Sequence, residues 1–303
     1  MPETSDSPAG FSPESVGDPV AHASTRGKEA TVEKLFGSIE TETRPSPARM
    51  AASLRGRVAI VTGASRGIGR AIALEFAASG VHVAFNYLDT GPESRLQANG
   101  VVAELQEFDV KVSSRSCDVR RPDDVTRFVK DVVREMGGLH FLVNNAGIGR
   151  DHALWRMTDE EWTCVLETNL AGSFYFIRAA APFLRAQEWG KIVNVASVHG
   201  VRGEFGLANY ISSKAGLMGL TRSAALELGP SNINVNAVAP GYIRTTQLTE
   251  QVPAEILDRA RDRSALGRLG DPQDVAHVVL FLCSEGARHI TGSVIPIDGG
   301  YLL

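Results

Sequence analysis

The stretch VAIVTGASRGIG, residues 58–69, joins a short apolar run rich in β-branched residues to a glycine-rich turn. Apolar residues then recur every three or four positions over 68–79, which is the period of a helix. A strand that passes through glycines directly into a helix is the first half of a βαβ unit. We therefore expect an α/β domain that begins at this strand.

The same alternation continues to the end of the chain. Helical spacing predicts helices at 68–79, 122–136, 168–185, 209–228 and 272–282. Short apolar runs predict strands at 58–61, 81–85, 111–116, 139–143, 191–195, 233–238 and 293–297. Strands that alternate with helices pair in parallel, and the helices cover both faces of the sheet. The expected fold class is α/β, a three-layer doubly wound Rossmann fold with a seven-stranded parallel sheet.

Residues 1–50 are rich in Ser, Pro, Thr and Glu and hold few large apolar residues. Such a segment cannot bury enough surface to offset the entropy of ordering. We expect a disordered tail over 1–50 and a single catalytic domain over 51–303. Met50, directly before the globular part, is expected to be the physiological start, with the tail an extension of the gene model. Neither a signal peptide nor a membrane helix is indicated, so a cytoplasmic location is expected.

The charge balance argues against polyanionic partners. A net charge of −4 and a pI near 6.0 give no basic surface for nucleic acid or an anionic membrane. Cys117, Cys164 and Cys283 are far apart and match neither a disulfide framework nor a thiolate metal site, and the seven histidines are scattered. We expect no metal, buried free thiols, and either a small molecule or a second copy of the chain as partner.

The turn after the first strand favours a nucleotide. Its glycines let the backbone approach a pyrophosphate, which the free N–H groups of the following helix stabilise. The letters of 63–67 also match the Gly-x-Ser-x-Gly nucleophile elbow of α/β-hydrolases. That elbow needs an oxyanion donor from an earlier strand-to-helix loop, and only the tail precedes this strand. Ser65 is therefore disfavoured as a nucleophile.

Polar residues at later strand ends bear on cofactor choice. Tyr87 stands where an NAD-selective site would carry a carboxylate, and Arg66 would attract a 2′-phosphate, so NADP(H) is favoured over NAD(H). Asp89 lies close enough to keep NAD(H) open. Asp118 could accept a hydrogen bond from the adenine amino group, and the small residues of 144–147 would let the backbone pass close to the cofactor. Each of these features also suits an ordinary helix cap or turn.

Three residues farther along predict proton transfer. Ser197 follows the fifth strand, and Tyr210 and Lys214 lie four residues apart on one face of a predicted helix. Reducing a carbonyl requires a proton on oxygen, and a free phenol with a pKa near 10 exchanges protons poorly at neutral pH. We expect the Lys214 ammonium to lower the pKa of Tyr210 and to reach the cofactor ribose, while Ser197 donates to the substrate oxygen.

Together these motifs resemble the short-chain dehydrogenase/reductase family over 54–303. The quoted residues are Thr62-Gly63-x-x-x-Gly67-x-Gly69, Asn144-Asn145-Ala146-Gly147, Asn169, Ser197, Tyr210-x-x-x-Lys214 and Pro240-Gly241. The resemblance implies that Asn169 positions a water in a proton relay from Lys214, that Ile243 and Thr245 contact the nicotinamide carboxamide, and that the protein is a tetramer or dimer. The expected catalytic residues are Asn169, Ser197, Tyr210 and Lys214. The expected cofactor-binding residues are Thr62, Gly63, Ser65, Arg66, Gly67, Ile68, Gly69, Asn86, Tyr87, Asp118, Val119, Asn145, Ala146, Gly147, Tyr210, Lys214, Pro240, Gly241, Ile243 and Thr245.

Within that family the segments 144–162 and 292–300 are similar to bacterial 3-oxoacyl-[acyl-carrier-protein] reductases and acetoacetyl-CoA reductases. An acidic carrier protein calls for cations beside the active-site mouth. Arg178, Arg185 and Lys191 could supply them, whereas 229–232 offers none, so binding of a carrier protein is doubtful. Residues 246–265, with Leu248, Val252, Ile256 and Leu257 as their apolar members, are expected to form a substrate lid or a helix packed on the core.

Three functions remain open. The leading one is an NADPH-dependent reductase of a 3-oxoacyl thioester or a similar ketone. The others are an NAD-dependent secondary-alcohol dehydrogenase and a non-catalytic dinucleotide sensor that has kept the fold. The intact set Ser197, Tyr210 and Lys214 argues against the sensor.

Overall fold

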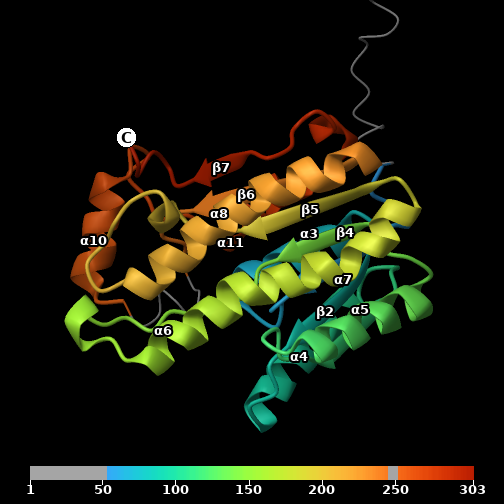
Figure 1. Cartoon of the computed structure of the whole chain (residues 1–303), viewed down its shortest axis with the longest axis horizontal. Coiled ribbons are helices and arrows are strands. Elements are labelled where there is room, and N and C mark those ends of the chain that lie inside the picture. Colours follow the sequence, from blue (N-terminus) through green and yellow to red (C-terminus); the bar gives the residue numbers. More distant parts are fainter. Residues whose placement is uncertain (1–52, 245–251) are drawn as a thin grey trace, which may run out of the picture. The chain divides into compact units, whose positions relative to one another are not determined.

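The computed structural model describes residues 53–244 and 252–303 (Figure 1). Its seven strands form one sheet in the order β3-β2-β1-β4-β5-β6-β7, and every neighbouring pair is parallel. The strands are β1 Val58–Thr62, β2 His82–Tyr87, β3 Val112–Ser116, β4 Phe141–Asn144, β5 Gly190–Val195, β6 Ile233–Pro240 and β7 Val294–Ile297. The strand order reverses between β1 and β4, which is where parallel sheets of this kind bind ligands.

Two helical layers sandwich the sheet. On one face, α3 (Gly67–Ala78), α4 (Pro92–Leu105) and α11 (Pro272–Cys283) share a core centred on Phe76 and Phe141, whose rings stack at 5.5 Å. On the other face, α5 (Pro122–Met136), α7 (Gly172–Ala186) and α8 (Ala208–Leu228) share a second core. The three-layer α/β fold expected from the sequence is confirmed.

Two short helices lie toward the carboxyl end of the sheet. α10 (Ala254–Arg263) lies at the end toward which the arrows of β5 and β7 point in Figure 1. α6 (Asp159–Leu166) leads through a π-helical turn, Glu167–Ala171, into α7. α10 packs through Ala260 against Val198 and Tyr301, so the second half of the expected lid is a helix packed on the domain.

Spacing alone missed α4 and α6. α4 buries only Ala98, Val101 and Leu105, and this narrow apolar stripe gives little helical signal. α6 has a different sequence signal, which is a threonine followed three residues later by a glutamate. Thr158 and Glu161 form a capping box, in which each side chain bonds the other residue's backbone N–H.

Some expectations fall on residues outside the described ranges. These are the tail over 1–50, Thr245, and the first part of the expected lid, including Leu248. Within the described ranges, none of the helices is long and apolar enough to span a bilayer.

Candidate active site

The turn after β1 is shaped by glycines that a side chain could not replace. Gly63 and Gly67 have φ angles of +64° and +56°, a region that L side chains rarely adopt. A Cβ on Gly69 would lie 2.6 Å from the Gly63 carbonyl oxygen and 2.5 Å from Nδ2 of Asn145. The backbone therefore packs here as closely as atoms allow, and it leads straight into α3.

Two of the expected cofactor residues brace this turn from the next strand. The Thr62 hydroxyl oxygen accepts hydrogen bonds from the backbone N–H groups of Asn145 and Ala146, both at 2.9 Å. The Asn145 side chain donates to the carbonyl oxygens of Thr62 and Gly63 at 2.9 and 3.1 Å. These contacts fix the ends of β1 and β4 to each other at the switch point of the sheet.

The ends of β2 and β3 lie beside the same turn. Asn86 is buried, donates to the Cys117 carbonyl at 2.8 Å and accepts from Gly63 N–H at 3.2 Å, so its side chain is occupied in joining three strand ends. Asp118 forms a forked ion pair with Arg120, and these hydrogen bonds lower the pKa of the carboxyl. Asp89, two residues after β2, is bonded to Arg95 and to Gly91 N–H.

This edge suits a dinucleotide. No acidic residue lies in the first turn of α3, and no side chain caps its N-terminus. Side chains therefore do not occupy the N–H groups at the start of this helix, beside the glycine turn. Free amide N–H groups and the positive end of the helix dipole stabilise a pyrophosphate. A Cβ on Gly147 would approach Nζ of Lys214 to 3.4 Å, so glycine at this position keeps space open beside the lysine. Gly63, Gly67 and Gly69 thus let the backbone make the tight turn that brings the N-terminus of α3 to this edge.

The expected chemical residues come together at the carboxyl end of β5. Ser197 follows the strand, is buried, and accepts a hydrogen bond from His199 N–H at 3.2 Å as the cap of a short 3₁₀ turn, Val198–Gly200. Its side chain also interacts with the phenol of Tyr210, on the first turn of α8, and this interaction acts to lower the pKa of the phenol. Serine and tyrosine hydroxyls therefore face one another where a substrate oxygen could bind both.

Lys214 lies one turn farther along α8 and is buried. Its Nζ donates to the Val195 carbonyl at 2.7 Å and lies 5.6 Å from the centre of the Tyr210 ring. Burial lowers the pKa of Lys214 to about 8. The last residue of β5, two residues before Ser197, thus holds the ammonium near the tyrosine ring.

One electrostatic expectation is wrong. Burial raises the pKa of Tyr210 to about 12, and the carboxylate of Asp151 raises it further, while the bond from Ser197 opposes both. Lys214 is not among the groups that shift this pKa, so the expected lowering is not found. Tyr210 is consequently a phenol that keeps its proton at neutral pH, a form suited to giving a proton rather than taking one.

Asn169 lies inside the π-helical turn and is fully buried. Its side chain accepts from Ile148 N–H at 2.8 Å and donates to the Ile148 carbonyl and to the Ser213 hydroxyl, both at 3.0 Å. Hydroxyls also bond the carbonyls around this wide turn, since Thr168 donates to Cys164 and Ser173 donates to Asn169. π turns in α-helices recur at functional sites. Asn169 thereby clamps the loop after β4 against α8.

The remaining expected contacts follow β6. Ile243 is buried and pairs with Gly270, and a Cβ on Gly241 would lie 3.0 Å from the Asp298 backbone. Sequence reasoning missed two neighbours of this region. Asp151 influences Tyr210 electrostatically, and the ring of His199 packs at 5.5 Å against that of Tyr242.

Lys191 is not at the active-site mouth. It is buried at the amino end of β5, the edge of the sheet opposite the site, where its Nζ donates to Asn234 Oδ1 at 2.6 Å. Arg178 and Arg185 are exposed on α7. Lys191 therefore cannot contact a carrier protein, whereas Arg178 and Arg185 are on the surface.

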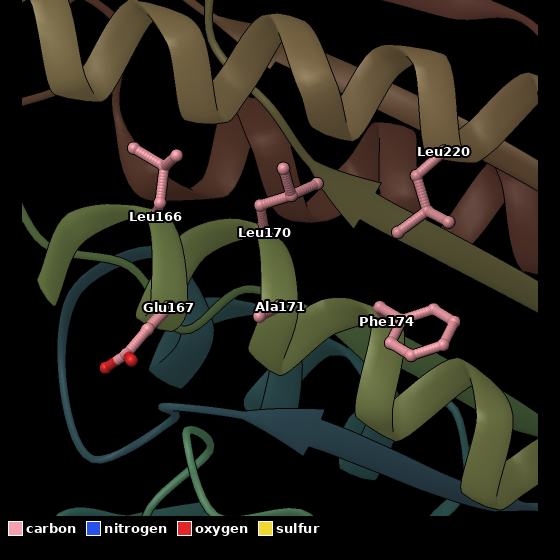
Figure 2. A pocket seen from close by; sticks show the side chains of 6 residues that line it. All are labelled: Leu166, Glu167, Leu170, Ala171, Phe174 and Leu220. Carbon is pink, nitrogen blue, oxygen red and sulfur yellow. The ribbon is translucent and has the colours of Figure 1, made fainter. Parts of the chain in front are cut away.

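An apolar hollow of about 440 Å³ lies apart from these residues, between α7 and α8 (Figure 2). Leu166 and Leu170 project toward the helix that carries Leu220, and Phe174 closes the row. Leu170 follows Asn169 in the sequence. The same helical segment therefore carries the buried Asn169 side chain and part of the lining of the hollow.

A protein-family model described as "Enoyl-(Acyl carrier protein) reductase" matches residues 63–302. Among solved structures, that of a candidate short-chain alcohol dehydrogenase from Sinorhizobium meliloti 1021 is similar, with a TM-score of 0.76 and 35% identity. The match covers 82% of this chain and 97% of that one.

Curated relatives are similar over the same region. The 3-oxoacyl-[acyl-carrier-protein] reductase FabG of Staphylococcus aureus is 44% identical over 242 residues, which is 80% of this chain and 96% of the relative. The enzyme of the same name from Thermotoga maritima is 42% identical over 250 residues, which is 82% of this chain and 99% of the relative.

Proposed function

Because the chain belongs to the short-chain dehydrogenase/reductase family and is an oxidoreductase of CH–OH and carbonyl groups, we propose that it reduces a 3-oxoacyl thioester or a similar ketone to the hydroxy product. The observation that carries this proposal is the meeting of Ser197, Tyr210 and the buried Lys214, in which Ser197 interacts with the phenol and Nζ of Lys214 lies 5.6 Å from the centre of the Tyr210 ring. The names of the curated relatives support a carbonyl, rather than the carbon–carbon double bond in the family model's description, as the bond reduced.

The cofactor class is a nicotinamide dinucleotide, and we propose NADP(H). Residues of the glycine turn and the N-terminus of α3 would hold the pyrophosphate, and Arg66 would face a 2′-phosphate. Tyr87 leaves the end of β2 without a carboxylate, and the carboxylate of Asp89 is already bonded to Arg95. Both features support a 2′-phosphate at this position, since a free carboxylate there would repel it.

The proposed chemistry uses the protein's hydroxyls in sequence. NADPH, when bound by the glycine turn and α3, would supply the hydride that adds to the carbonyl carbon. Ser197 donates a hydrogen bond to the carbonyl oxygen and orients it toward Tyr210. Tyr210 gives its proton to that oxygen as negative charge develops on it. The Lys214 ammonium, held by the Val195 carbonyl, stabilises the phenolate left behind, and Asn169 keeps the loop after β4 in place beside the lysine.

Two observations bear on the thiol that carries the acyl group, and they point in opposite directions. The names of the curated relatives favour an acyl-carrier-linked substrate. The burial of Lys191 removes one expected docking cation. We propose a thioester substrate with a small-molecule or carrier-linked thiol. We also propose a homotetramer or homodimer, which the exposed apolar hollow between α7 and α8 supports.

The decisive test is turnover with one hydroxyl removed. NADPH and NADH absorbance would be followed with acetoacetyl-CoA, a carrier-linked 3-oxoacyl chain and a simple cyclic ketone. Tyr210→Phe is expected to lower kcat by at least about a hundredfold while NADPH still binds with its wild-type Kd. Wild-type activity in Tyr210→Phe would refute the mechanism. NADH turnover that exceeds NADPH turnover, with a secondary alcohol as the better substrate, would favour the dehydrogenase alternative.

A further inference from the structure

The turn after β5 fixes the hydroxyl of Ser197. The hydroxyl oxygen accepts a hydrogen bond from His199 N–H at 3.2 Å, and the Ser197 carbonyl accepts one from Gly200 N–H at 2.9 Å. A hydroxyl that accepts through its oxygen still has its own proton to donate. The direction in which Ser197 can offer that proton therefore depends on where the backbone of His199 lies.

The helix α8 supports this turn from one side. A Cβ on Gly200 would lie 3.0 Å from the backbone nitrogen of Ala215 and 3.0 Å from the carbonyl carbon of Lys214. Backbone thus packs directly on backbone here, with no side chain between them. The turn that holds the serine therefore rests on the helix that carries Tyr210 and Lys214.

The side chain of His199 joins this turn to two further strand ends. Its ring is buried and packs edge to face against that of Tyr242, after β6, with the centres 5.5 Å apart and the planes at 83°. It also lies 6.5 Å from the ring of Tyr301, after β7, and the two tyrosine rings are 5.7 Å apart. We name His199, Tyr242 and Tyr301 the ring cluster. Three neighbouring strand ends thus contribute one ring each beside the turn that holds Ser197.

The helix α10 holds the ring cluster at Tyr301. Nε of Arg263 donates to the Tyr301 carbonyl at 3.1 Å, and the guanidinium carbon lies 5.1 Å from the centre of the Tyr301 ring. Ala260, on the same helix, packs with Tyr301 and with Val198. The helix in the second half of the expected lid therefore contacts both the ring cluster and the residue that follows Ser197.

Nδ1 of the His199 ring is a polar atom that this packing does not use. It is buried and, within residues 53–244 and 252–303, it has no hydrogen-bond partner. Burial lowers the pKa of His199, so the ring packs against the tyrosines as an uncharged aromatic group at neutral pH. The shape of the ring and its edge-to-face contact are therefore what the cluster needs, and a phenylalanine would supply both.

We propose that His199 is a positioning residue for the reduction: its ring, packed against Tyr242 and Tyr301, holds the backbone N–H that directs the Ser197 hydroxyl. The inference rests on the proposed function and adds to it a residue that acts through the serine rather than on the substrate. Because α10 holds Tyr301, the same contacts would pass a shift of that helix on to the serine.

The test separates the ring of His199 from its nitrogen. His199→Leu and His199→Phe both remove the unpaired Nδ1, but only His199→Phe keeps a flat ring against the tyrosines. Reduction of the 3-oxoacyl thioester that the wild type reduces fastest would be followed with NADPH in single turnovers, so that slow variants are still measured. We expect the rate to fall at least about tenfold in His199→Leu and less than about threefold in His199→Phe, with the Kd of NADPH unchanged in both.

A second comparison asks whether His199 acts through the serine. In a Ser197→Ala background there is no hydroxyl to direct, so adding His199→Leu should change the rate by less than about twofold. Losses that multiply instead would show that the histidine acts elsewhere and would overturn the inference. His140→Leu is the matched control and should leave the rate unchanged, because the ring of His140 packs edge to face with that of Trp189 at the amino end of β4.

An unchanged rate in His199→Leu, or an equal loss in His199→Phe, would also overturn the inference and leave the proposed function standing. If His199→Leu does not fold, Tyr301→Leu and Tyr301→Phe make the same comparison from another member of the ring cluster, with the same two outcomes. A wild type that reduces no 3-oxoacyl thioester with NADPH would overturn the proposed function and this inference with it.

Discussion

Nζ of Lys214 donates a 2.7 Å hydrogen bond to the carbonyl oxygen of Val195, two residues before Ser197. The strand that positions the serine thus also positions the ammonium. This bond uses one of three N–H donors of the lysine and leaves two for other partners. The candidate catalytic groups after β5 and on α8 are therefore linked through buried atoms of the protein itself.

The first prediction concerns pH. The pKa of Lys214 is lowered to about 8 and that of Tyr210 is raised to about 12, so both groups are protonated at pH 7. Reduction should be fastest below about pH 8 and should slow as pH rises through that value, because Lys214 loses its charge while Tyr210 keeps its proton. Oxidation of the alcohol needs the phenolate and should rise with pH across the same range.

Profiles of kcat against pH in both directions would check this. Lys214→Met is expected to be slow at every pH and to lack the change near pH 8. A wild-type reduction rate that rises between pH 8 and 10 would contradict the assignment of these two groups.

The second prediction concerns the crowded glycine turn. Gly69→Ala would place its methyl group within 2.6 Å of the Gly63 carbonyl, so the turn must open. We expect it to destabilise the protein by about 1–3 kcal/mol and to weaken NADPH binding. Gly100→Ala is the control, since a Cβ there meets nothing within 4 Å in the middle of α4. That variant should gain about 0.5–1 kcal/mol and bind NADPH normally. Urea unfolding and a fluorescence titration with NADPH would report both effects.

The third prediction tests the bridge between β1 and β4. Thr62→Val keeps the shape of the side chain and removes the oxygen that two N–H groups share. Leaving two donors without a partner should cost about 1–3 kcal/mol of folding stability. Thr126→Val, which loses only a bond to the Pro122 carbonyl, should cost less. Equal midpoints of urea unfolding in the two variants would argue against the bridging role.

The fourth prediction concerns cofactor preference. Tyr87→Asp would place a carboxylate at the end of β2, where it can accept from a ribose 2′-hydroxyl and repel a 2′-phosphate. The ratio of kcat/KM for NADPH over NADH should fall by about tenfold or more. Asp89→Asn serves as the comparison, because Asp89 is already bonded to Arg95 and Gly91 and should affect the ratio less. A ratio that Tyr87→Asp leaves unchanged would place the selectivity elsewhere.

The fold was largely predictable from the sequence, because strands buried on both faces form short runs dominated by apolar residues. β1 and β5 are buried at every residue, and their boundaries match the expected ones to within a residue. α4 could not be predicted in the same way, since it rests on three buried residues and is stabilised mostly by its neighbours.

The sequence predicts which side chains come together near the end of β5, but it does not predict their pKa values. The spacing of Tyr210 and Lys214 predicts that they share a helix face, and they do. The direction of the Tyr210 pKa shift depends on how much water the fold removes, which spacing does not report. The role of Asn169 depends on a wide helical turn that has no simple sequence signal, and the burial of Lys191 depends on which edge of the sheet it occupies.

The wide turn at Glu167–Ala171 also bears on how the sequence can change in length. Successive residues of an α-helix are about 100° apart around its axis, so losing one residue turns everything on one side of the gap by that angle. A single-residue deletion in this turn would close it to ordinary α-helix and rotate α6, with its capping box, relative to Asn169 and α7. Homologous insertions and deletions should therefore collect in loops such as 229–232 and be rare in this helix, although much of it faces the surface.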